Sequence, residues 1–532
     1  MAQSALLLLI LLLPLLLLQK QEQVESLPLS TRGRWIVDAT TGSRVKLRCV
    51  NWAAHMPVVL AEGLDRRPLP EIAVLIADLG FNCVRLTWAT HMFTVPHYVN
   101  LTVAGSLRGQ NLSEALEGVE RNNPSMMEMT VAEAYEEVVN QLGISGLMVV
   151  LDNHVSKPKW CCGREDGNGF FGDTFFDPEE WLQGLDSVAR RFCTFPQVVA
   201  MSMRNELRGP KQTHASWYNH VTLGVRTINT VNPNVLIIVS GLNFDTDLSF
   251  LLSRPLPIHS LKLVYEAHWY AFSEGKQEEW ESPTHSPSHI CSAVAERFHH
   301  RAGFMAPLFV SEFGMDQRGL NRADNHFMTC FLGFAAERDI DWAMWALQGS
   351  YYRRDGVDGF EESYGVLRSD WSGPKHQDFS TRFRLIQSTL RDPTSKHENY
   401  KIIYHPLTGK CIQVIENTIL LMDCQGRTRW SHIGNAAGPI RLAETNLCIG
   451  FQGHGRPVSL TTDCNNSWKA ISGREFQIGF HDENLGKKTC LDGNSSLDTS
   501  QIFAKKCMCL GGSVCSQNPQ SQWFRLITSN VY

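Results

Sequence analysis

Two glutamates in the sequence stand at the ends of short apolar runs. Glu206 ends the run VVAMSMRNE, directly after Asn205, and Glu312 lies near the end of PLFVSEF. A lone carboxylate in such a place is more often a solvated or helix-capping group, so the pairing is the informative feature. One carboxylic acid can donate a proton while a second carboxylate attacks as a nucleophile. Cleavage of a glycosidic bond needs this pair, one group for the leaving oxygen and one for the anomeric carbon.

The segments that would position these glutamates form a regular alternation between residues 45 and 390. Eight apolar runs are separated by amphipathic segments: VKLRCVNW, CVRLTW, LMVVLDNH, VVAMSMRNE, VLIIVSG, LVYEAHWY, PLFVSEF and DWAMWAL. Such runs are typical of parallel strands buried on both faces, and residues 178–192 between them repeat apolar positions at helical spacing. The alternation predicts a closed (β/α)8 TIM barrel. The alternative is an open doubly wound sheet, but the sequence has no glycine-rich phosphate loop to support it.

In a (β/α)8 barrel the active site forms at the carboxyl ends of the strands. The ends of these runs are polar and aromatic. They supply Asn51, Trp52, Arg85, Trp88, Asp152, Asn153, His154, Asn205, Glu206, His268, Trp269, Tyr270, Glu312 and Trp345.

Over residues 34–390 this pattern resembles glycoside hydrolase family five, the cellulase and mannanase group. That family carries Arg, His, Asn-Glu, His-x-Tyr, Glu and Trp on successive strands. The matching residues occur here in the same order: Arg85, His154, Asn205, Glu206, His268, Tyr270, Glu312 and Trp345. The proline that follows Asn-Glu in the family is Leu207 here, a departure that bears on the substrate more than on the mechanism.

The resemblance implies a retaining mechanism with two distinct carboxyl roles. Glu206 would be the acid/base, with a pKa raised by the nearby second carboxylate. Glu312 would be the nucleophile, kept ionised and oriented by Arg85 and Tyr270.

The remaining matched residues would handle the substrate. Asn205 would hold the sugar 2-hydroxyl, His154 and His268 would orient the carboxylates and bind substrate, and Trp345 would stack under the sugar. The alternative for the histidines and Trp345 is ordinary core packing. Asp152, His154, Cys161 and Cys162 fit no zinc spacing, so we expect disulfides there rather than a metal, and no cofactor.

The composition changes at residues 391–399, which we interpret as a linker. Between residues 400 and 532 cysteine pairs are each followed by a tryptophan, in three units of about 40 residues. This repeat predicts three short-range disulfides: Cys411–Cys424, Cys448–Cys464 and Cys490–Cys507, with Cys509–Cys515 as a fourth.

The repeat resembles a ricin B-type β-trefoil, a carbohydrate-binding module. The resemblance implies that a sugar-binding aspartate follows the first cysteine of a unit by two positions. Only the third unit has it, as Asp492, whereas the others have Gln413 and Gly450. A second glycan could therefore bind at Asp492, and a purely structural trefoil is the alternative.

The start of the chain predicts entry into the secretory pathway. An apolar run of 14 residues, Ala5 to Leu18, suits a signal peptide over residues 1–26, with an uncleaved anchor as the alternative. The Asn-x-Ser/Thr acceptors at Asn100, Asn111, Asn465 and Asn494 agree with this route. Fifteen cysteines fit an oxidising compartment, and the odd seven before residue 410 leave at least one unpaired.

The bulk composition excludes other classes of function. A net charge of −5 offers no basic field for nucleic acid, and no other segment could cross a membrane. The sequence therefore predicts a secreted, retaining glycosidase whose partner is a β-linked glycan. The alternative is a catalytically silent, secreted carbohydrate-binding protein that keeps the barrel as a scaffold.

Overall fold

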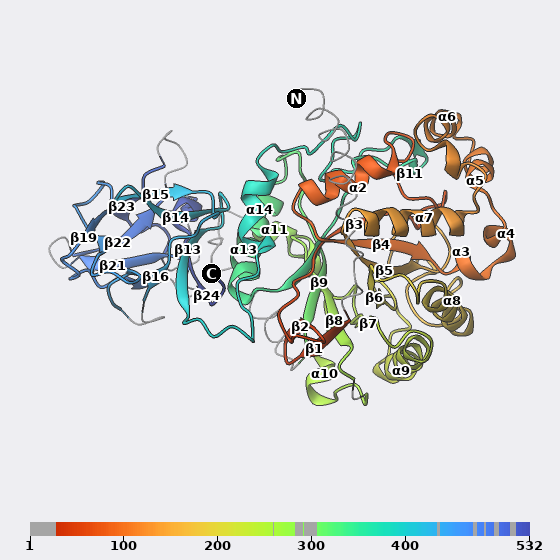
Figure 1. The fold of residues 1–532 in the computed structure, drawn as a ribbon, viewed down its shortest axis with the longest axis horizontal. Helices are drawn as coiled ribbons and strands as arrows, with labels where there is room; N and C mark the ends of the chain where they lie inside the picture. The colour runs from red at the N-terminus through yellow and green to blue at the C-terminus, as the bar shows by residue number, and fades with distance from the viewer. Residues whose placement is uncertain are drawn as a thin grey trace, which may run out of the picture.

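The computed structural model describes residues 28–258, 260–281, 291, 306–432, 437–471, 476–482, 486–493, 500–510 and 518–532. The predicted signal peptide lies outside these residues, as do Asn494 and Cys515. The largest part is a closed barrel of eight parallel strands in the order β10-β3-β4-β5-β6-β7-β8-β9 (Figure 1). The strands are β3 (Arg48–Trp52), β4 (Cys83–Ala89), β5 (Met148–Val155), β6 (Val198–Ser202), β7 (Leu236–Val239), β8 (Leu263–His268), β9 (Leu308–Phe313) and β10 (Asp341–Met344). Each lies in one of the eight apolar runs, so the predicted TIM barrel is confirmed.

Helices follow the strands and cover the outside of the barrel. They are α2 (Leu69–Asp78), α3 (His91–Thr94), α4 (Pro96–Val99), α5 (Val103–Gly109), α6 (Ser113–Asn122), α7 (Val131–Ile144), α8 (Pro178–Arg191), α9 (His214–Val231), α10 (Phe250–Ser253), α11 (Gln277–Glu281), α13 (Arg322–Arg338) and α14 (Phe379–Gln387). Helix α8 illustrates how the sequence sets its bounds. The Asp177 carboxylate accepts hydrogen bonds from the backbone N–H groups of Glu179 and Glu180, and Pro178 occupies the first turn.

A hairpin of β1 (Leu29–Arg32) and β2 (Trp35–Asp38) precedes the barrel. Leu29 and Ile36 belong to the same buried cluster as Leu47, Val150 and Phe309, so the hairpin packs against the interior of the barrel. The barrel domain predicted to begin at residue 34 therefore includes β1 as well. The prediction missed it because a four-residue strand is too short to show a periodic pattern.

Residues 400–532 form a separate, antiparallel β-rich region. Its strands are β13 (Tyr400–His405), β14 (Lys410–Ile415), β15 (Thr418–Met422), β16 (Trp430–Ser431), β17 (Arg441–Leu442), β18 (Cys448–Gly450), β19 (Ser459–Thr461), β20 (Lys469–Ala470), β21 (Ile478–Asp482), β22 (Lys487–Asp492), β23 (Phe503–Lys506) and β24 (Arg525–Ser529). Disulfides join Cys411 to Cys424, Cys448 to Cys464 and Cys490 to Cys507, which are the pairs that the spacing predicts. Trp430, Trp468 and Trp523 are fully buried.

The barrel domain has disulfides of its own. Cys49–Cys83 joins β3 to β4, Cys291 pairs with Cys330, and the adjacent Cys161 and Cys162 are bonded to each other. Cys193 is free and exposed, which supplies the unpaired thiol that the odd count requires. Cys509 is disulfide-bonded too, and its predicted partner Cys515 is not among the described residues.

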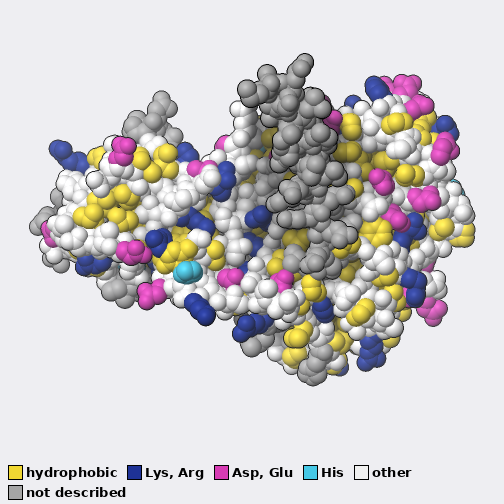
Figure 2. Space-filling view, in the orientation of Figure 1, with side chains coloured by type: hydrophobic (Ala, Val, Ile, Leu, Met, Phe, Trp, Pro, Cys, Tyr) yellow, Lys and Arg dark blue, Asp and Glu magenta, His cyan; other side chains and the backbone are white. Residues whose placement is uncertain are grey.

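The β-rich region packs on helices α13 and α14, which lie between it and the barrel strands (Figure 1). Thr329 donates a hydrogen bond to Gln520 at 2.9 Å, and Arg384 pairs with Asp423 at 2.9 Å. On the face shown in Figure 2, Lys and Arg side chains are interspersed with Asp and Glu. No helix in the described part of the chain is both long and apolar enough to span a membrane.

Candidate active site

A cleft of about 960 Å³ opens at the carboxyl ends of the barrel strands. Glu206 and Glu312 line it, together with His154, His268, Tyr270 and Trp345. Six of the eight residues matched to the family are therefore brought to one cleft. Arg85 and Asn205 are fully buried and lie beneath its surface.

Arg85, on β4, is the centre of a buried polar network. Its Nη1 donates to Asn51 Oδ1 and Glu312 Oε1, each at 2.9 Å. Its Nη2 donates to Asp152 Oδ1 and Asn205 Oδ1, again at 2.9 Å. Burial disfavours the guanidinium charge, but the surrounding carboxylates raise the pKa of Arg85 overall. Arg85 thus orients Glu312 from below with a permanent positive charge.

His268 lies close to both glutamates, and Tyr270 contacts Glu312. His268 Nδ1 lies 2.8 Å from Glu206 Oε1 and 3.6 Å from Glu312 Oε2. The Tyr270 hydroxyl donates to Glu312 Oε2 at 3.0 Å. Carboxylate oxygens of Glu206 and Glu312 lie within 4.8 Å of each other and of His268. The structure therefore places a carboxyl pair, with separate hydrogen-bond partners, at the mouth of the barrel.

Burial controls the protonation of this pair. It raises the pKa of Glu206 to about 7, although Arg208 and Arg85 oppose the shift. Burial likewise raises the pKa of Glu312 to about 7 against the pull of His268 and Arg85. The prediction that the second carboxylate raises the pKa of Glu206 names the wrong main cause. Glu312 is also less readily ionised than predicted. The sequence does not show how strongly a side chain is desolvated, so the prediction left this effect of burial out.

The protonation of the pair follows from its hydrogen bonds. Two carboxyls this close repel each other when both are ionised, so near neutral pH they hold one proton between them. Arg85 and Tyr270 both donate to Glu312 and favour its charge. These two bonds favour the charge on Glu312 and the shared proton on Glu206.

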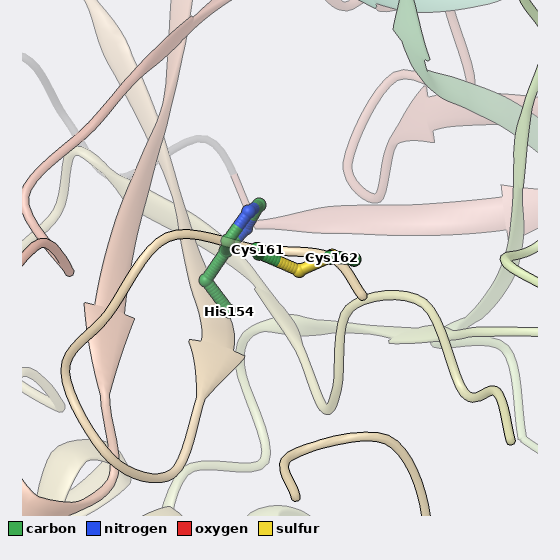
Figure 3. Close-up of side chains that lie close together, drawn as sticks. All are labelled: His154, Cys161 and Cys162. Carbon is green, nitrogen blue, oxygen red and sulfur yellow. A yellow bond between two sulfur atoms is a disulfide. The ribbon is translucent and has the colours of Figure 1, made fainter. Parts of the chain in front are cut away.

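His154 and Asn205 occupy positions that differ from their implied roles. His154 Nδ1 bonds Asp152 Oδ2 at 2.7 Å and its ring stacks on Trp345 with centroids 5.5 Å apart, so its partners are Asp152 and Trp345 rather than the two glutamates. Asn205 Nδ2 lies 3.6 Å from each sulfur of the Cys161–Cys162 disulfide, which lies beside His154 (Figure 3). The disulfide lines the cleft whereas Asn205 is fully buried, so here the disulfide is the surface that a ligand meets.

The site also contains groups that the sequence patterns did not single out. Glu266 accepts a hydrogen bond from Ser202 at 2.5 Å and lies 3.5 Å from Arg85. Asp245, beyond the end of β7, accepts one from the backbone N–H of Glu206 at 2.9 Å. Glu266 was inside an apolar run, with a side chain that the alternation of a strand points inward. Asp245 had no signal in sequence because a loop brings it to the site.

Asp492, the predicted lectin residue, is a buried part of the β-rich region. Its side chain is 4% exposed and its carboxylate lies 3.3 Å from Lys505 Nζ. It also accepts a hydrogen bond from Gln522 Nε2 at 3.2 Å. These contacts give Asp492 a structural role in the folded region.

Two clusters of the described residues have donor atoms close enough for a metal ion. One is His154 with Cys161 and Cys162, and the other is Glu206 with His268 and Glu312. In the first cluster the sulfurs of Cys161 and Cys162 are bonded to each other, so they offer no thiolate ligands. In the second, His268 is already hydrogen-bonded to Glu206. Neither donor set has the form of a tetrahedral structural site.

A parallel barrel with a buried carboxyl pair in a cleft at its carboxyl end defines the class of barrel glycoside hydrolases. Residues 50–350 match the cellulase family, glycosyl hydrolase family 5. The chain belongs to this family and is an O-glycosyl hydrolase.

Relatives agree with this assignment. The chain is 45% identical over 529 residues to a glycosyl hydrolase 5 family protein of Chamaecyparis obtusa, covering 95% of this chain and 94% of that one. It is 23% identical over 379 residues to the major extracellular endoglucanase of Xanthomonas campestris, covering 68% and 71% of the two chains.

Solved structures show the same fold. The catalytic domain of the Xanthomonas endoglucanase has a TM-score of 0.55 at 21% identity, covering 68% of this chain and 99% of that one. A cellotetraose complex of the Pyrococcus horikoshii endocellulase has a TM-score of 0.55 at 18% identity, with the same coverages.

Proposed function

We propose that the protein is a secreted, retaining glycosidase that cleaves β-linked glycans by double displacement. The observation that carries this proposal is the carboxyl pair in the cleft, with oxygens within 4.8 Å. A retaining enzyme places its carboxyl groups about 5–5.5 Å apart, whereas an inverting enzyme needs about 6.5–9.5 Å to fit a water molecule. The short spacing favours retention.

The hydrogen bonds around the pair support one assignment of roles. Glu312 accepts from Arg85 and Tyr270, so its charge is stabilised and its oxygens are aimed for attack on the anomeric carbon. Glu206 carries the proton, which passes to the leaving oxygen as the glycosidic bond breaks. Glu206 then takes a proton from water, whose oxygen attacks the glycosyl–Glu312 ester and releases the sugar with its original configuration.

The substrate proposal rests on the cleft and on the relatives. Trp345 and Trp160 supply aromatic faces to the cleft, a surface on which sugar rings pack. The Xanthomonas relative is named an endoglucanase, and the Pyrococcus neighbour is an endocellulase in complex with cellotetraose. A β-glucan is therefore the first substrate to test.

The deciding experiment is a panel of aryl β-glycosides and soluble β-glucans and β-mannans, followed by proton NMR of the first-formed anomer. We expect hydrolysis with the β-anomer formed first, and its loss in Glu312→Gln. An α-anomer as first product would rule out double displacement. Binding without turnover by the wild-type protein would favour the silent carbohydrate-binding alternative.

Secretion has support from the surface of the protein. The acceptor residues Asn100, Asn111 and Asn465 are all exposed, as glycosylation requires. The disulfides are stable in an oxidising compartment. Expression in eukaryotic cells should give an extracellular product that begins near residue 27 and loses mass on treatment with an N-glycosidase. A cell-retained product with an intact N-terminus would contradict this.

We also propose that the β-rich region is a trefoil that binds a second glycan. Trp430 Nε1 donates to the backbone oxygen of Ile412 and Trp468 Nε1 to that of Ile449, which are equivalent positions of two repeats. This regularity supports the three-unit arrangement. Glycan-array binding by full-length Glu312→Gln, with and without Asp492→Asn, tests the second site. Binding that survives Asp492→Asn would remove Asp492 from it.

A further inference from the structure

The loop after β7 has an unusual backbone that faces the acid/base residue. Asn243, Phe244 and Asp245 have φ angles of 53°, 60° and 56°, and Glu206 itself has a φ of 46°. Left-handed conformations cost non-glycine residues roughly 1–2 kcal/mol each. Such strain persists only where surrounding contacts hold it, and it gathers at functional sites.

Asp245 accepts two hydrogen bonds that connect this loop to residues of the site. Its carboxylate Oδ2 accepts from the backbone N–H of Glu206 at 2.9 Å. Its backbone oxygen accepts from the backbone N–H of His268 at 3.0 Å. His268 Nδ1 in turn lies 2.8 Å from Glu206 Oε1, which closes a ring of three residues.

A neighbouring contact strengthens the same connection. The backbone N–H of Phe244 donates to the backbone oxygen of Leu207 at 3.1 Å. The strained loop is therefore bonded to the residue after Glu206 as well as to Glu206. Asp245 is fully buried, and its Oδ1 has no hydrogen-bond partner among the described residues, so Oδ2 is the atom in use.

We propose that Asp245 is a positioning residue for acid catalysis: it holds the backbone of Glu206 in the left-handed conformation that aims the Glu206 carboxyl at the cleft. Asp245 reaches neither the cleft surface nor a substrate, and it acts through Glu206 and His268. The inference rests on the proposed role of Glu206.

The variant Asp245→Gly tests whether Asp245 positions Glu206. Glycine adopts positive φ without strain, so the turn keeps its shape while the acceptor of the Glu206 N–H is removed. Asp245→Asn restores an acceptor at a position where asparagine tolerates the same backbone. We expect Asp245→Asn to stay within about 3-fold of the wild type, since it keeps the hydrogen bond and the conformation.

The leaving group of the substrate distinguishes positioning from general damage. Phenyl β-glycosides need a proton from Glu206 to depart, whereas 2,4-dinitrophenyl β-glycosides leave without one. For Asp245→Gly we expect kcat/KM on the phenyl glycoside to fall about 10–100-fold, because a small misplacement of a catalytic group is costly. On the dinitrophenyl glycoside it should change about 3-fold or less. Equal losses on both substrates, or no loss on either, would overturn the proposal.

A matched control exists at the opposite end of the barrel. Asp341 is also a buried aspartate that accepts a backbone N–H from a neighbouring segment, that of Leu47 at 2.8 Å. Asp341→Gly should lower stability but leave the ratio of the two kcat/KM values unchanged. If the ratio shifted as much as in Asp245→Gly, the effect would be one of stability and the proposal would be wrong.

A second readout does not depend on activity. Hydrogen exchange of the Glu206 amide should be faster in Asp245→Gly than in the wild type, and unchanged in Asp341→Gly. Unchanged exchange in Asp245→Gly would contradict the proposal. If the wild type hydrolysed no β-glycoside, the proposed function would fail while this measurement still tested Asp245.

Discussion

The two ends of the barrel both bury charged groups, but they balance them differently. At the amino end, Arg44 pairs with Asp341 at 2.9 Å and Lys46 with Asp339 at 2.7 Å, one cation to each anion. At the carboxyl end, the carboxylates of Asp152, Glu206, Asp245, Glu266 and Glu312 gather around Arg85. The first arrangement gives each anion its own cation, and in the second several carboxyl groups share Arg85.

The difference appears in the protonation of Asp339 compared with Glu206 and Glu312, although burial also raises the pKa of Asp341 against Arg44. Burial raises the pKa of Asp339, but Lys46 and Arg44 more than offset this and hold it below its usual value. Burial raises the pKa of Glu206 and Glu312 to about 7, and Arg85 does not compensate. A balanced network stabilises the fold, whereas an unbalanced one keeps a proton available for transfer.

The largest expected effect comes from removing either glutamate at the carboxyl end of the barrel. Glu312→Gln and Glu206→Gln should each lower kcat by about 10³-fold or more, because one removes the proposed nucleophile and the other the proposed proton donor. Steady-state kinetics on the substrate selected by the panel measures this. Near-wild-type activity in either variant would refute the assigned roles, and circular dichroism checks that the fold is kept.

Removing an ion pair at the amino end of the barrel should lower stability and leave turnover unchanged. Lys46→Met leaves Asp339 buried and unpaired, which costs about 3–5 kcal/mol. The exposed pair Arg190–Asp186 offers a control, since Arg190→Met should cost about 0.5 kcal/mol or less. Denaturant unfolding compares the two. A large fall in kcat for folded Lys46→Met would show that the ends are not independent.

The pH dependence of stability should have opposite signs for Glu206 and Asp339. The raised pKa of Glu206 means that its contribution is favourable below the unfolded value and is lost as pH rises through about 7. Glu206→Gln should therefore gain roughly 2–4 °C in Tm over the wild type at pH 8 and little at pH 4.5. The lowered pKa of Asp339 stabilises above the unfolded value, so Asp339→Asn should be less stable at pH 7, with the difference fading as pH falls below about 4. Thermal scans that gave both variants the same sign would contradict this.

The smallest effect concerns the disulfide in the cleft. Cys161 and Cys162 are adjacent, so their bond closes almost no chain and adds little stability through chain entropy. The double variant Cys161→Ser, Cys162→Ser should keep its Tm within roughly 2 °C but lose several-fold in kcat/KM, because it loosens the surface over Asn205. Opening Cys411–Cys424 should instead cost about 3 kcal/mol and leave kinetics unchanged. Unchanged kinetics in the first variant would make that disulfide incidental.

Sequence predicted the barrel because its eight strands are buried on both faces and therefore read as apolar runs. Together with the family resemblance, it also predicted that Glu206, Glu312, Arg85, His268 and Tyr270 lie together, because residues on parallel strands keep a fixed relation to the barrel. It missed Asp245, which reaches the site through a loop. It did not foresee the surroundings of Asn205, because the packing of the Cys161–Cys162 disulfide against the Asn205 amide is a tertiary contact with no periodic signal.

The segment between the barrel and the β-rich region has a mechanical consequence. Residues 391–399, predicted as a linker, are bonded at both sides: Arg391 N–H donates to Asp339 at 2.9 Å and Asp392 N–H to Asn530 at 2.9 Å. The end of the chain returns to the same place, where Asn530 N–H donates to Leu390 at 3.1 Å. The barrel and the β-rich region are thus joined by a rigid connection rather than by a flexible linker. If the β-rich region binds a glycan as proposed, that glycan would meet the cleft at one fixed orientation and distance.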